Sequence, residues 1–342
     1  MLWLFDFRLV TTRLEAVSGL LITIVAAIGV LATLFIIQVL LSVRDRRRFP
    51  PIGTLVDGSH VVRLGHGTPA VVFESGIASS SLSWGPIQSE LAGETATYSY
   101  DRAGLGWSAA QGSECSLKRI AENLHALLDR LQVPRPIILV GHSFGGYAVR
   151  FYAHQYPEEV AGLVLVDAVT PQEWMEPSSE QRGRLRRAIF ATRVSGILAY
   201  FGIVRFGLWL LLMRKKEKPG PLSRFSQTLQ RIRSEVRKIR PDMLPQIRAH
   251  WSRPGFYWAM AAHLQALPIS AKIVFGCQVP KHVSVTVLSG AHQPPERVAE
   301  QTAIATRHII AAKSGHFVNL DEPELVITAV REQLRNCVIA RQ

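Results

Sequence analysis

Residues 139–149 read LVGHSFGGYAV, and they place Ser143 between an apolar run and a stretch compatible with a helix. The serine is preceded by Gly141 and followed by Gly145 and Gly146. A Gly-x-Ser-x-Gly segment between a strand and a helix is typical of a nucleophile elbow, a sharp turn that exposes the serine hydroxyl. The glycines are needed because side chains there would clash with the neighbouring strand and helix. The pentapeptide is a weak signal by itself, so the surrounding sequence has to supply the context.

Short apolar, β-branched runs recur on both sides of Ser143, with helix-compatible stretches such as 117–131 and 144–156 between them. The runs are HVVRL, AVVFESG, ATYSYDRAG, IILVGHS, GLVLVDAV, VSVTVLSG and RHIIAAKSGH. Short strands that alternate with helices predict an α/β fold, with a mostly parallel sheet covered by helices on both faces. The strand that leads to Ser143 is therefore expected near the centre of that sheet.

Two polar residues follow Ser143 in the chain order of one class of catalytic triad. Asp167 ends the run VLVD, and His316 follows the last strand in AAKSGHFVNLDEP. A serine hydroxyl is a poor nucleophile at neutral pH unless a histidine takes its proton and a carboxylate stabilises the imidazolium. The pattern therefore predicts Ser143 as the nucleophile, His316 as the base and Asp167 as the acid.

An upstream loop, FESGIASSSLSW, is the candidate for oxyanion stabilisation. Gly76 allows the backbone to turn its amides towards the nucleophile, and a tetrahedral oxyanion needs two such donors. We assign the amides of Ile77 and Phe144, the latter directly after the nucleophile. In YDRAG we interpret Asp101 and Arg102 as a structural pair below the site.

These segments resemble the alpha/beta-hydrolase family over roughly residues 52–340. The resemblance rests on ESGIASSSLSW, YDRAGLGWS, LVGHSFGG, LVLVDAV and SGHFVNLDEPELV, in the family's order and spacing. It implies Ser143 as nucleophile and His316 as base, with no cofactor. Many members carry the acid after the strand that here reads VTVLSGAHQPPE, which has no aspartate. Its nearest carboxylate is Glu296, which we keep as the alternative to the favoured Asp167.

The composition points away from metal and disulfide chemistry. The chain has 342 residues, 48% of them hydrophobic, which is ample for a core. Its three cysteines, Cys115, Cys277 and Cys337, are far apart, and neither HExxH nor a paired CxxC occurs. Neither a disulfide framework nor a metal site is expected.

The N-terminal segment is a candidate membrane anchor. Between Glu15 and Arg44 lie 28 residues without a charge, and about 20 apolar residues cross a bilayer core. A signal peptide has a shorter apolar region of about 7–15 residues and a cleavage site, whereas this run ends in RDRRRFPP. We predict one span at about residues 17–43.

The charges beside this span predict its orientation. Four arginines follow it, Arg44, Arg46, Arg47 and Arg48, and two precede it. The more basic flank tends to stay in the cytoplasm, so the catalytic domain is expected to face the cytoplasm. Separated, unpaired cysteines agree with a reducing compartment.

The net charge of +13 is concentrated in one insertion. Residues 178–253 hold 18 Lys/Arg and 4 Asp/Glu, and the sheet-forming parts are mildly acidic, so nucleic-acid binding is not expected. The insertion lies where this family places its cap. We therefore divide the chain into an anchor with its basic flank (1–50), a first core part (51–176), a basic cap (177–254) and a second core part (255–342).

Two stretches of the cap are apolar enough to meet lipid. Residues 222–239 space apolar side chains three and four apart between arginines, which predicts a helix that packs on the core or lies on an anionic membrane surface. Residues 194–213 carry one charge, Arg205. A second crossing there would put Asp167 and His316 on opposite sides of the bilayer. We therefore expect an interfacial or core-packed segment, or else a re-entrant one.

Together these features predict a single-pass, membrane-anchored serine hydrolase. Its expected substrate is a lipophilic acyl ester, similar to an acylglycerol or a lysophospholipid, cleaved through an acyl-enzyme on Ser143. The expected partners are this substrate and an anionic membrane surface contacted by the cap. The alternatives are a hydrolase of small soluble esters or peptides, and a non-catalytic member of the fold that binds a ligand.

Overall fold

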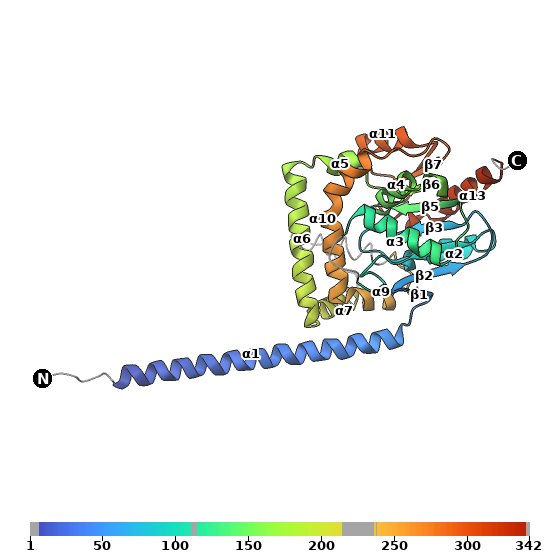
Figure 1. Cartoon of the computed structure of the whole chain (residues 1–342). Helices are drawn as coiled ribbons and strands as arrows, with labels where there is room; N and C mark the ends of the chain where they lie inside the picture. Colours follow the sequence, from blue (N-terminus) through green and yellow to red (C-terminus); the bar gives the residue numbers. More distant parts are fainter. Residues whose placement is uncertain (1–6, 111–114, 214–235, 237, 340–342) are drawn as a thin grey trace.

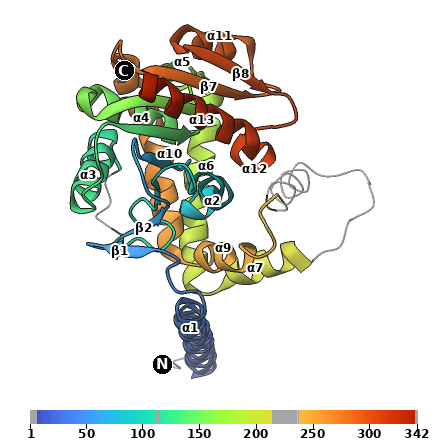
Figure 2. The ribbon, with the colours of Figure 1, turned by 90° about the vertical axis from the view of Figure 1, so that its right-hand side faces the viewer.

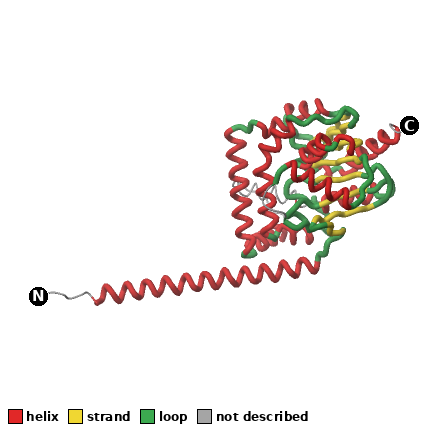
Figure 3. The backbone as a smooth tube through the Cα atoms, in the orientation of Figure 1, coloured by secondary structure: helices red, strands yellow, loops and turns green. Residues whose placement is uncertain are grey.

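The predicted runs form one sheet in the computed structural model, which describes residues 7–110, 115–213, 236 and 238–339. Eight strands lie in the order β1-β2-β4-β3-β5-β6-β7-β8 (Figures 1 and 3). They are β1 (Thr54–Val56), β2 (Ser59–Leu64), β3 (Val71–Glu74), β4 (Thr97–Tyr100), β5 (Ile137–His142), β6 (Val160–Val166), β7 (Ser284–Gly290) and β8 (Arg307–Ala311). Strands β3 to β8 pair in parallel, whereas β2 is antiparallel to β4 and to β1. The mostly parallel sheet is thus confirmed, with β1 as an added edge strand that the sequence analysis missed.

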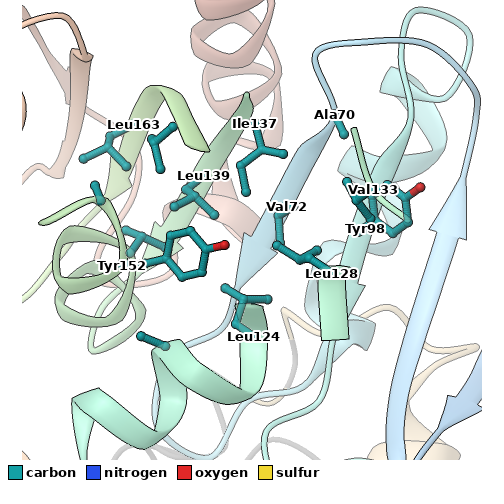
Figure 4. Packing of buried hydrophobic residues seen from close by; sticks show 14 of the residues in the cluster. Ala70, Val72, Tyr98, Leu124, Leu128, Val133, Ile137, Leu139, Tyr152 and Leu163 are labelled. Atoms are coloured by element: carbon teal, nitrogen blue, oxygen red, sulfur yellow. The ribbon is translucent and has the colours of Figure 1, made fainter. Parts of the chain in front are cut away.

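Helices cover both faces of the sheet, as the sequence predicts. The core helices are α2 (Gly85–Leu91), α3 (Leu117–Arg130), α4 (Gly145–Gln155), α11 (Pro295–Ile304), α12 (Val318–Asp321) and α13 (Pro323–Ile339), and two short 3₁₀ turns lie at Ser81–Trp84 and Pro157–Glu159. Helices α3 and α4 pack on one face, and α2 and α13 on the other. Figure 4 shows Leu124 and Leu128 of α3 and Tyr152 of α4 against Val72 and Leu139 of the sheet. Strand β5, which leads to Ser143, is buried along its whole length.

A helical cap separates β6 from β7. It comprises α5 (Pro171–Met175), α6 (Ser179–Tyr200), α7 (Ile203–Met213), α9 (Leu244–Trp251) and α10 (Pro254–Phe275). Ser178 and Gln181 form a capping box that starts α6. Helix α10 packs along α6 and also reaches α4, so the cap rests on the core beside the nucleophile elbow (Figure 1). The helical insertion therefore runs beyond the boundary at residue 254 that we expected.

Of the two apolar stretches predicted in the cap, only residues 194–213 lie wholly within the described residues. The helix predicted for residues 222–239 falls largely outside the described residues. The apolar stretch 194–213 is not one straight segment, because α6 ends at Tyr200 and α7 leaves it at an angle of 103°. Gly202 lies in the turn with a φ of +71°, a conformation that glycine adopts without a steric penalty.

Helix α1 (Phe7–Arg48) projects away from the rest of the molecule (Figures 1 and 2). Within the described residues it is the one single helix long and apolar enough to cross a membrane, over Glu15–Arg48 with a mean hydropathy of 2.9. None of its most apolar window is buried in the protein. The bent pair α6–α7 would be a second candidate if it were counted as one span.

The C-terminal part of α1 is fixed to the cap by polar contacts. The amide of Gln38 donates to the Ser252 carbonyl (2.7 Å) and accepts from Nε of Arg205 (2.8 Å). The same guanidinium forms an ion pair with Asp45. Gln38 is 3% exposed and Asp45 8% exposed, so these contacts, which we call the joint between α1 and the cap, are largely shielded from water. The charge of Arg205 is therefore balanced by α1, which the sequence did not reveal.

The fold requires a close approach of β5 and α4 at Gly141. A Cβ at this position would lie 2.7 Å from the Gly145 carbonyl oxygen and 2.7 Å from a methyl of Val149. We expect Gly141→Ala to lower the free energy of unfolding by about 1–3 kcal/mol, because backbone must move to relieve the overlap. Thermal unfolding of the full-length protein in detergent measures this change. Gly93→Ala is the control, since nothing lies within 4 Å of its added Cβ, and equal melting temperatures of the two variants would contradict the prediction.

Candidate active site

Ser143, His316 and Asp167 come together at the carboxyl ends of the strands. Nε2 of His316 lies 3.0 Å from Oγ of Ser143, and its Nδ1 lies 2.6 Å from Oδ2 of Asp167. An ionised carboxylate can only accept, so Nδ1 carries the hydrogen and Nε2 is free to accept the serine proton. The geometry is that of a nucleophile, a base and an orienting acid in series.

Ser143 occupies a strained turn between β5 and α4. Its φ is +55°, which is uncommon for a residue with a side chain and is a conformation often found at active sites. Gly145 and Gly146 make the turn possible, because a Cβ on either would meet the Glu74 carbonyl oxygen at 2.5 Å or Cβ of Ala168 at 2.4 Å. The sharp turn predicted from GHSFGG is therefore present.

Asp167 is completely buried and held from several sides. Its Oδ1 accepts from the Gly290 amide (3.0 Å) and from Nε2 of Gln293 (2.8 Å), and Arg297 lies 3.6 Å from Oδ2. Burial opposes ionisation, but the hydrogen bond from His316 and the charge of Arg297 outweigh it and hold the pKa of Asp167 below its usual value. The carboxylate is therefore charged at neutral pH.

The alternative acid, Glu296, lies elsewhere. It is exposed in the first turn of α11. The loop between β7 and α11, where many relatives would carry the acid, instead supplies Gln293 as a hydrogen-bond donor to Asp167. The structure thus brings Asp167 to His316.

His142 binds the backbone of His316 through its imidazole ring. Its Nε2 lies 2.8 Å from the carbonyl oxygen of His316, which can only accept, so this nitrogen is the donor. Burial, and then the neighbouring His316, lower the pKa of His142 to about 3, so it stays neutral. It therefore helps to position His316.

The loop after β3 passes directly beside the nucleophile. A Cβ added to Gly76 would lie 3.2 Å from Cβ of Ser143 and 3.0 Å from Nδ1 of His142. Phe144 is the N-cap residue of α4, so its amide belongs to the first free donors of that helix. Ile77 and Phe144, the predicted oxyanion residues, both pack in the cluster that joins the core to the cap.

Arg102 holds this loop in place. Its guanidinium donates to the carbonyls of Ser75 and Gly76, both at 2.6 Å, and pairs with buried Glu74. In a trans peptide the carbonyl of Gly76 and the amide of the next residue, Ile77, point in opposite directions. Binding the carbonyl to Arg102 therefore turns the Ile77 amide away from the guanidinium, as its predicted role requires.

The guanidinium of Arg102 also contacts Phe144, the second predicted oxyanion residue, and the cap. It lies 5.5 Å from the ring centroid of Phe144, and its Nε donates to Nε2 of His263 on α10 at 2.9 Å. Asp101 and Arg102, which we interpreted as a structural pair, do not bind each other, and each has its own buried partners. Asp101 binds His60 at 2.8 Å and the amides of Ser81 and Trp107.

Sequence reasoning missed the residues that support the site. Gln293, Arg297 and His263 lie far from Ser143 along the chain and carry no motif of their own. Polar residues directly after β7 were the available signal for Gln293, since strand ends gather at one edge of a parallel sheet. No cluster of three or more potential metal ligands occurs among the described residues.

The acid assignment leads to a prediction about the reactivity of Ser143. A fluorophosphonate forms a covalent bond with an activated serine, and its labelling rate measures the activation. We expect Asp167→Asn to slow labelling by about 10³–10⁴-fold, because an amide can leave His316 in the wrong tautomer. Glu296→Gln is the control and should label at the wild-type rate. Slow labelling of the Glu296 variant with normal labelling of the Asp167 variant would reverse the assignment.

A second prediction concerns Arg102. Arg102→Lys keeps a positive charge beside Glu74, but one ammonium group cannot reproduce the planar fork that binds two carbonyls and His263. We expect the maximal labelling rate to fall by about 10–100-fold while the probe concentration at half-maximal rate changes little, because the loss affects the developing oxyanion. Arg63→Lys is the control, because the Arg63 side chain on β2 is exposed. If only the probe concentration at half-maximal rate changed, Arg102 would serve probe binding instead.

Comparisons with known proteins agree with this geometry. A model of the alpha/beta hydrolase family matches residues 66–329. An AB hydrolase superfamily protein of Gibberella zeae is 22% identical over 77% of this chain and 85% of its own. YqjL of Bacillus subtilis, an uncharacterised protein, is 30% identical over 105 residues, 31% of this chain and 42% of YqjL. The chain thus matches less than half the length of this curated relative.

Solved structures show the same fold at low sequence identity. A thermophilic esterase from Thermogutta terrifontis has a TM-score of 0.57 and 22% identity, covering 81% of this chain and 93% of the esterase. A laboratory-evolved variant of potato epoxide hydrolase has a TM-score of 0.65 and 18% identity, covering 83% and 98%. With the family model matching most of its length, the chain belongs to the alpha/beta hydrolase family.

Proposed function

We propose that the protein is a membrane-anchored serine hydrolase that cleaves lipophilic acyl esters. The observation that carries this proposal is the continuous series of hydrogen bonds from Ser143 through His316 to a buried, ionised Asp167. Such a series activates a serine for acyl transfer. The structural likeness to an esterase agrees with ester hydrolysis.

In the proposed reaction, Oγ of Ser143 attacks the ester carbonyl carbon while its proton passes to Nε2 of His316. The amides of Ile77 and Phe144 stabilise the oxyanion. The carbon–oxygen bond to the alcohol then breaks, and His316 gives its proton to the departing alcohol. A water molecule attacks the acyl-enzyme, with His316 again taking the proton and returning it to Oγ as the acid leaves. Asp167 stays ionised throughout and stabilises the imidazolium.

A lipophilic substrate is supported by the apolar surface around α1 and the cap. Helix α1 exposes its apolar side chains, and α6 and α7 expose Phe190, Ile197, Phe206 and Trp209. Exposed apolar surface of this extent marks a contact with lipid or protein. Because the joint of Arg205 with Gln38 and Asp45 holds α7 beside α1, an anchored α1 would bring the cap to the bilayer surface. We further propose a single crossing with the catalytic domain in the cytoplasm.

The alternative is a hydrolase of small soluble esters whose anchor only sets its location. The exposure of the His316 side chain favours it, since 41% of that side chain is open to solvent. A non-catalytic, ligand-binding role is the other alternative, and reaction with a serine-directed probe distinguishes it. The dependence of activity on acyl length distinguishes the two enzymes.

The test combines a probe with a substrate panel. We expect Ser143→Ala to abolish both fluorophosphonate labelling and ester hydrolysis, a loss of several orders of magnitude, because the remaining residues supply binding and oxyanion donors only. On monoacylglycerols presented in detergent, kcat/KM of the wild type should rise with acyl length. Wild-type labelling of the alanine variant would exclude Ser143 as the nucleophile. Constant kcat/KM from acetyl to palmitoyl esters would favour the soluble substrates.

A further inference from the structure

A groove of about 710 Å³ runs along α1 where this helix meets the cap. Its walls come from the last four turns of α1, from the loop around Trp107 and from the start of α10. It does not include Ser143 or His316 in its lining, so it is separate from the candidate active site. Its volume lies within the range of sites for small ligands, about 300–1,000 Å³.

One side of the groove is an apolar stripe on α1. Phe35, Val39 and Val43 follow one another at four-residue spacing, so they lie along one face of the helix. They are 44%, 43% and 40% exposed, which leaves much of their surface uncovered. A neighbouring face of the helix, with Gln38 and Asp45, is the one that binds the cap. The stripe is therefore an uncovered apolar surface of α1, next to the face of the helix that is bound to the cap.

The other end of the groove is cationic. Arg46 and Arg253 both line it, and the positive charge of Arg46 acts on Arg253. Burial, and then Arg46, lower the pKa of Arg253 to about 10, which still leaves it charged at neutral pH. Asp45, the carboxylate in this lining, is bound to Arg205. His250, also in the lining, stays neutral because burial lowers its pKa to about 3.

The groove is apolar along its stripe and cationic at its end, which matches the acyl chain and the anionic headgroup of a lipid at the edge of a bilayer. Its apolar stripe begins in the charge-free part of α1, and its two arginines lie at the basic flank that follows. If α1 crosses a membrane, the stripe faces acyl chains and the arginines lie at the level of the headgroups, where cations attract anionic lipid. Arginine also binds phosphate oxygens through two parallel hydrogen bonds.

We propose that this groove binds an acidic phospholipid of the membrane, with its phosphate between Arg46 and Arg253 and one acyl chain along Phe35, Val39 and Val43. The inference rests on the membrane anchoring proposed above. A bound lipid would fill the space between α1 and the start of α10 and so stabilise the position of the cap relative to the bilayer.

Thermal unfolding of the full-length protein in a neutral detergent tests the proposal. We expect phosphatidylglycerol to raise the Tm by about 4 °C more than phosphatidylcholine of the same chain length, because a ligand that binds only the folded state stabilises it. Arg46→Gln should lose at least half of this difference. Val39→Trp, which places an indole in the groove, should lose it as well.

Matched controls distinguish lipid binding in the groove from a general attraction between positive charge and anionic lipid. Arg47→Gln removes a positive charge next to Arg46 at a position that does not line the groove, and it should respond to phosphatidylglycerol as the wild type does. Inorganic phosphate alone should give no comparable shift, because it lacks the acyl chain. An equal response of the Arg46 and Arg47 variants, an equal effect of both lipids, or an equal shift with free phosphate would each overturn the proposal.

Labelling of Ser143 in the same samples keeps this test distinct from the test of the proposed function. If the lipid response is absent while Ser143 still reacts with the fluorophosphonate, the groove proposal fails and the hydrolase proposal stands. If the lipid response is present and Ser143 does not react in any sample, the groove proposal stands and the hydrolase proposal fails.

Discussion

The close contact of β5 with the first turn of α4 is the constraint on which the site depends. It leaves no room for a side chain at Gly141, and the turn beside it holds Ser143 at a φ of +55°. Gly145 and Gly146 are crowded in turn by Glu74 of β3 and by Ala168 after β6. Because the hydroxyl emerges from this turn, His316 can reach it from the loop after β8 at 3.0 Å. Burial of the whole of β5 holds the turn in place, so packing of the core also fixes the position of the Ser143 hydroxyl.

The polar groups around this turn form two sets of contacts, one around Asp167 and one around Arg102. Asp167 orients His316 and is itself held by Gly290, Gln293 and Arg297. On the other side, Arg102 binds the carbonyls of the loop that precedes Ile77 and reaches the cap through His263. Asp167, Glu74 and Arg102 are each paired with an opposite charge or hydrogen bonded, which offsets the cost of removing them from water. Hydrogen bonds through Arg102 thereby connect the cap to the loop of the predicted oxyanion residue Ile77, so a movement of α10 would be transmitted to this loop.

The contact of α1 with the cap gives the apolar surfaces a common orientation. Arg205 would be costly in an apolar segment by itself, and its pairing with Asp45 and Gln38 satisfies it. The same joint holds Arg205 of α7 against Gln38, in the charge-free part of α1. In the proposed anchored state, the cap and the groove along α1 therefore lie together at the bilayer surface.

The sequence by itself determined the α/β fold, the strand-to-helix turn and the order of Ser143, Asp167 and His316, because these depend on local periodicity, on glycine and on short motifs. It left two candidate acids open, and the tertiary structure brought Asp167 to His316 and left Glu296 exposed. It did not reveal which partners Asp101 and Arg102 bind, nor the joint between Arg205 and Asp45. Such pairings join residues 28 to 160 positions apart, and a charge in the sequence does not state which partner the fold will bring to it.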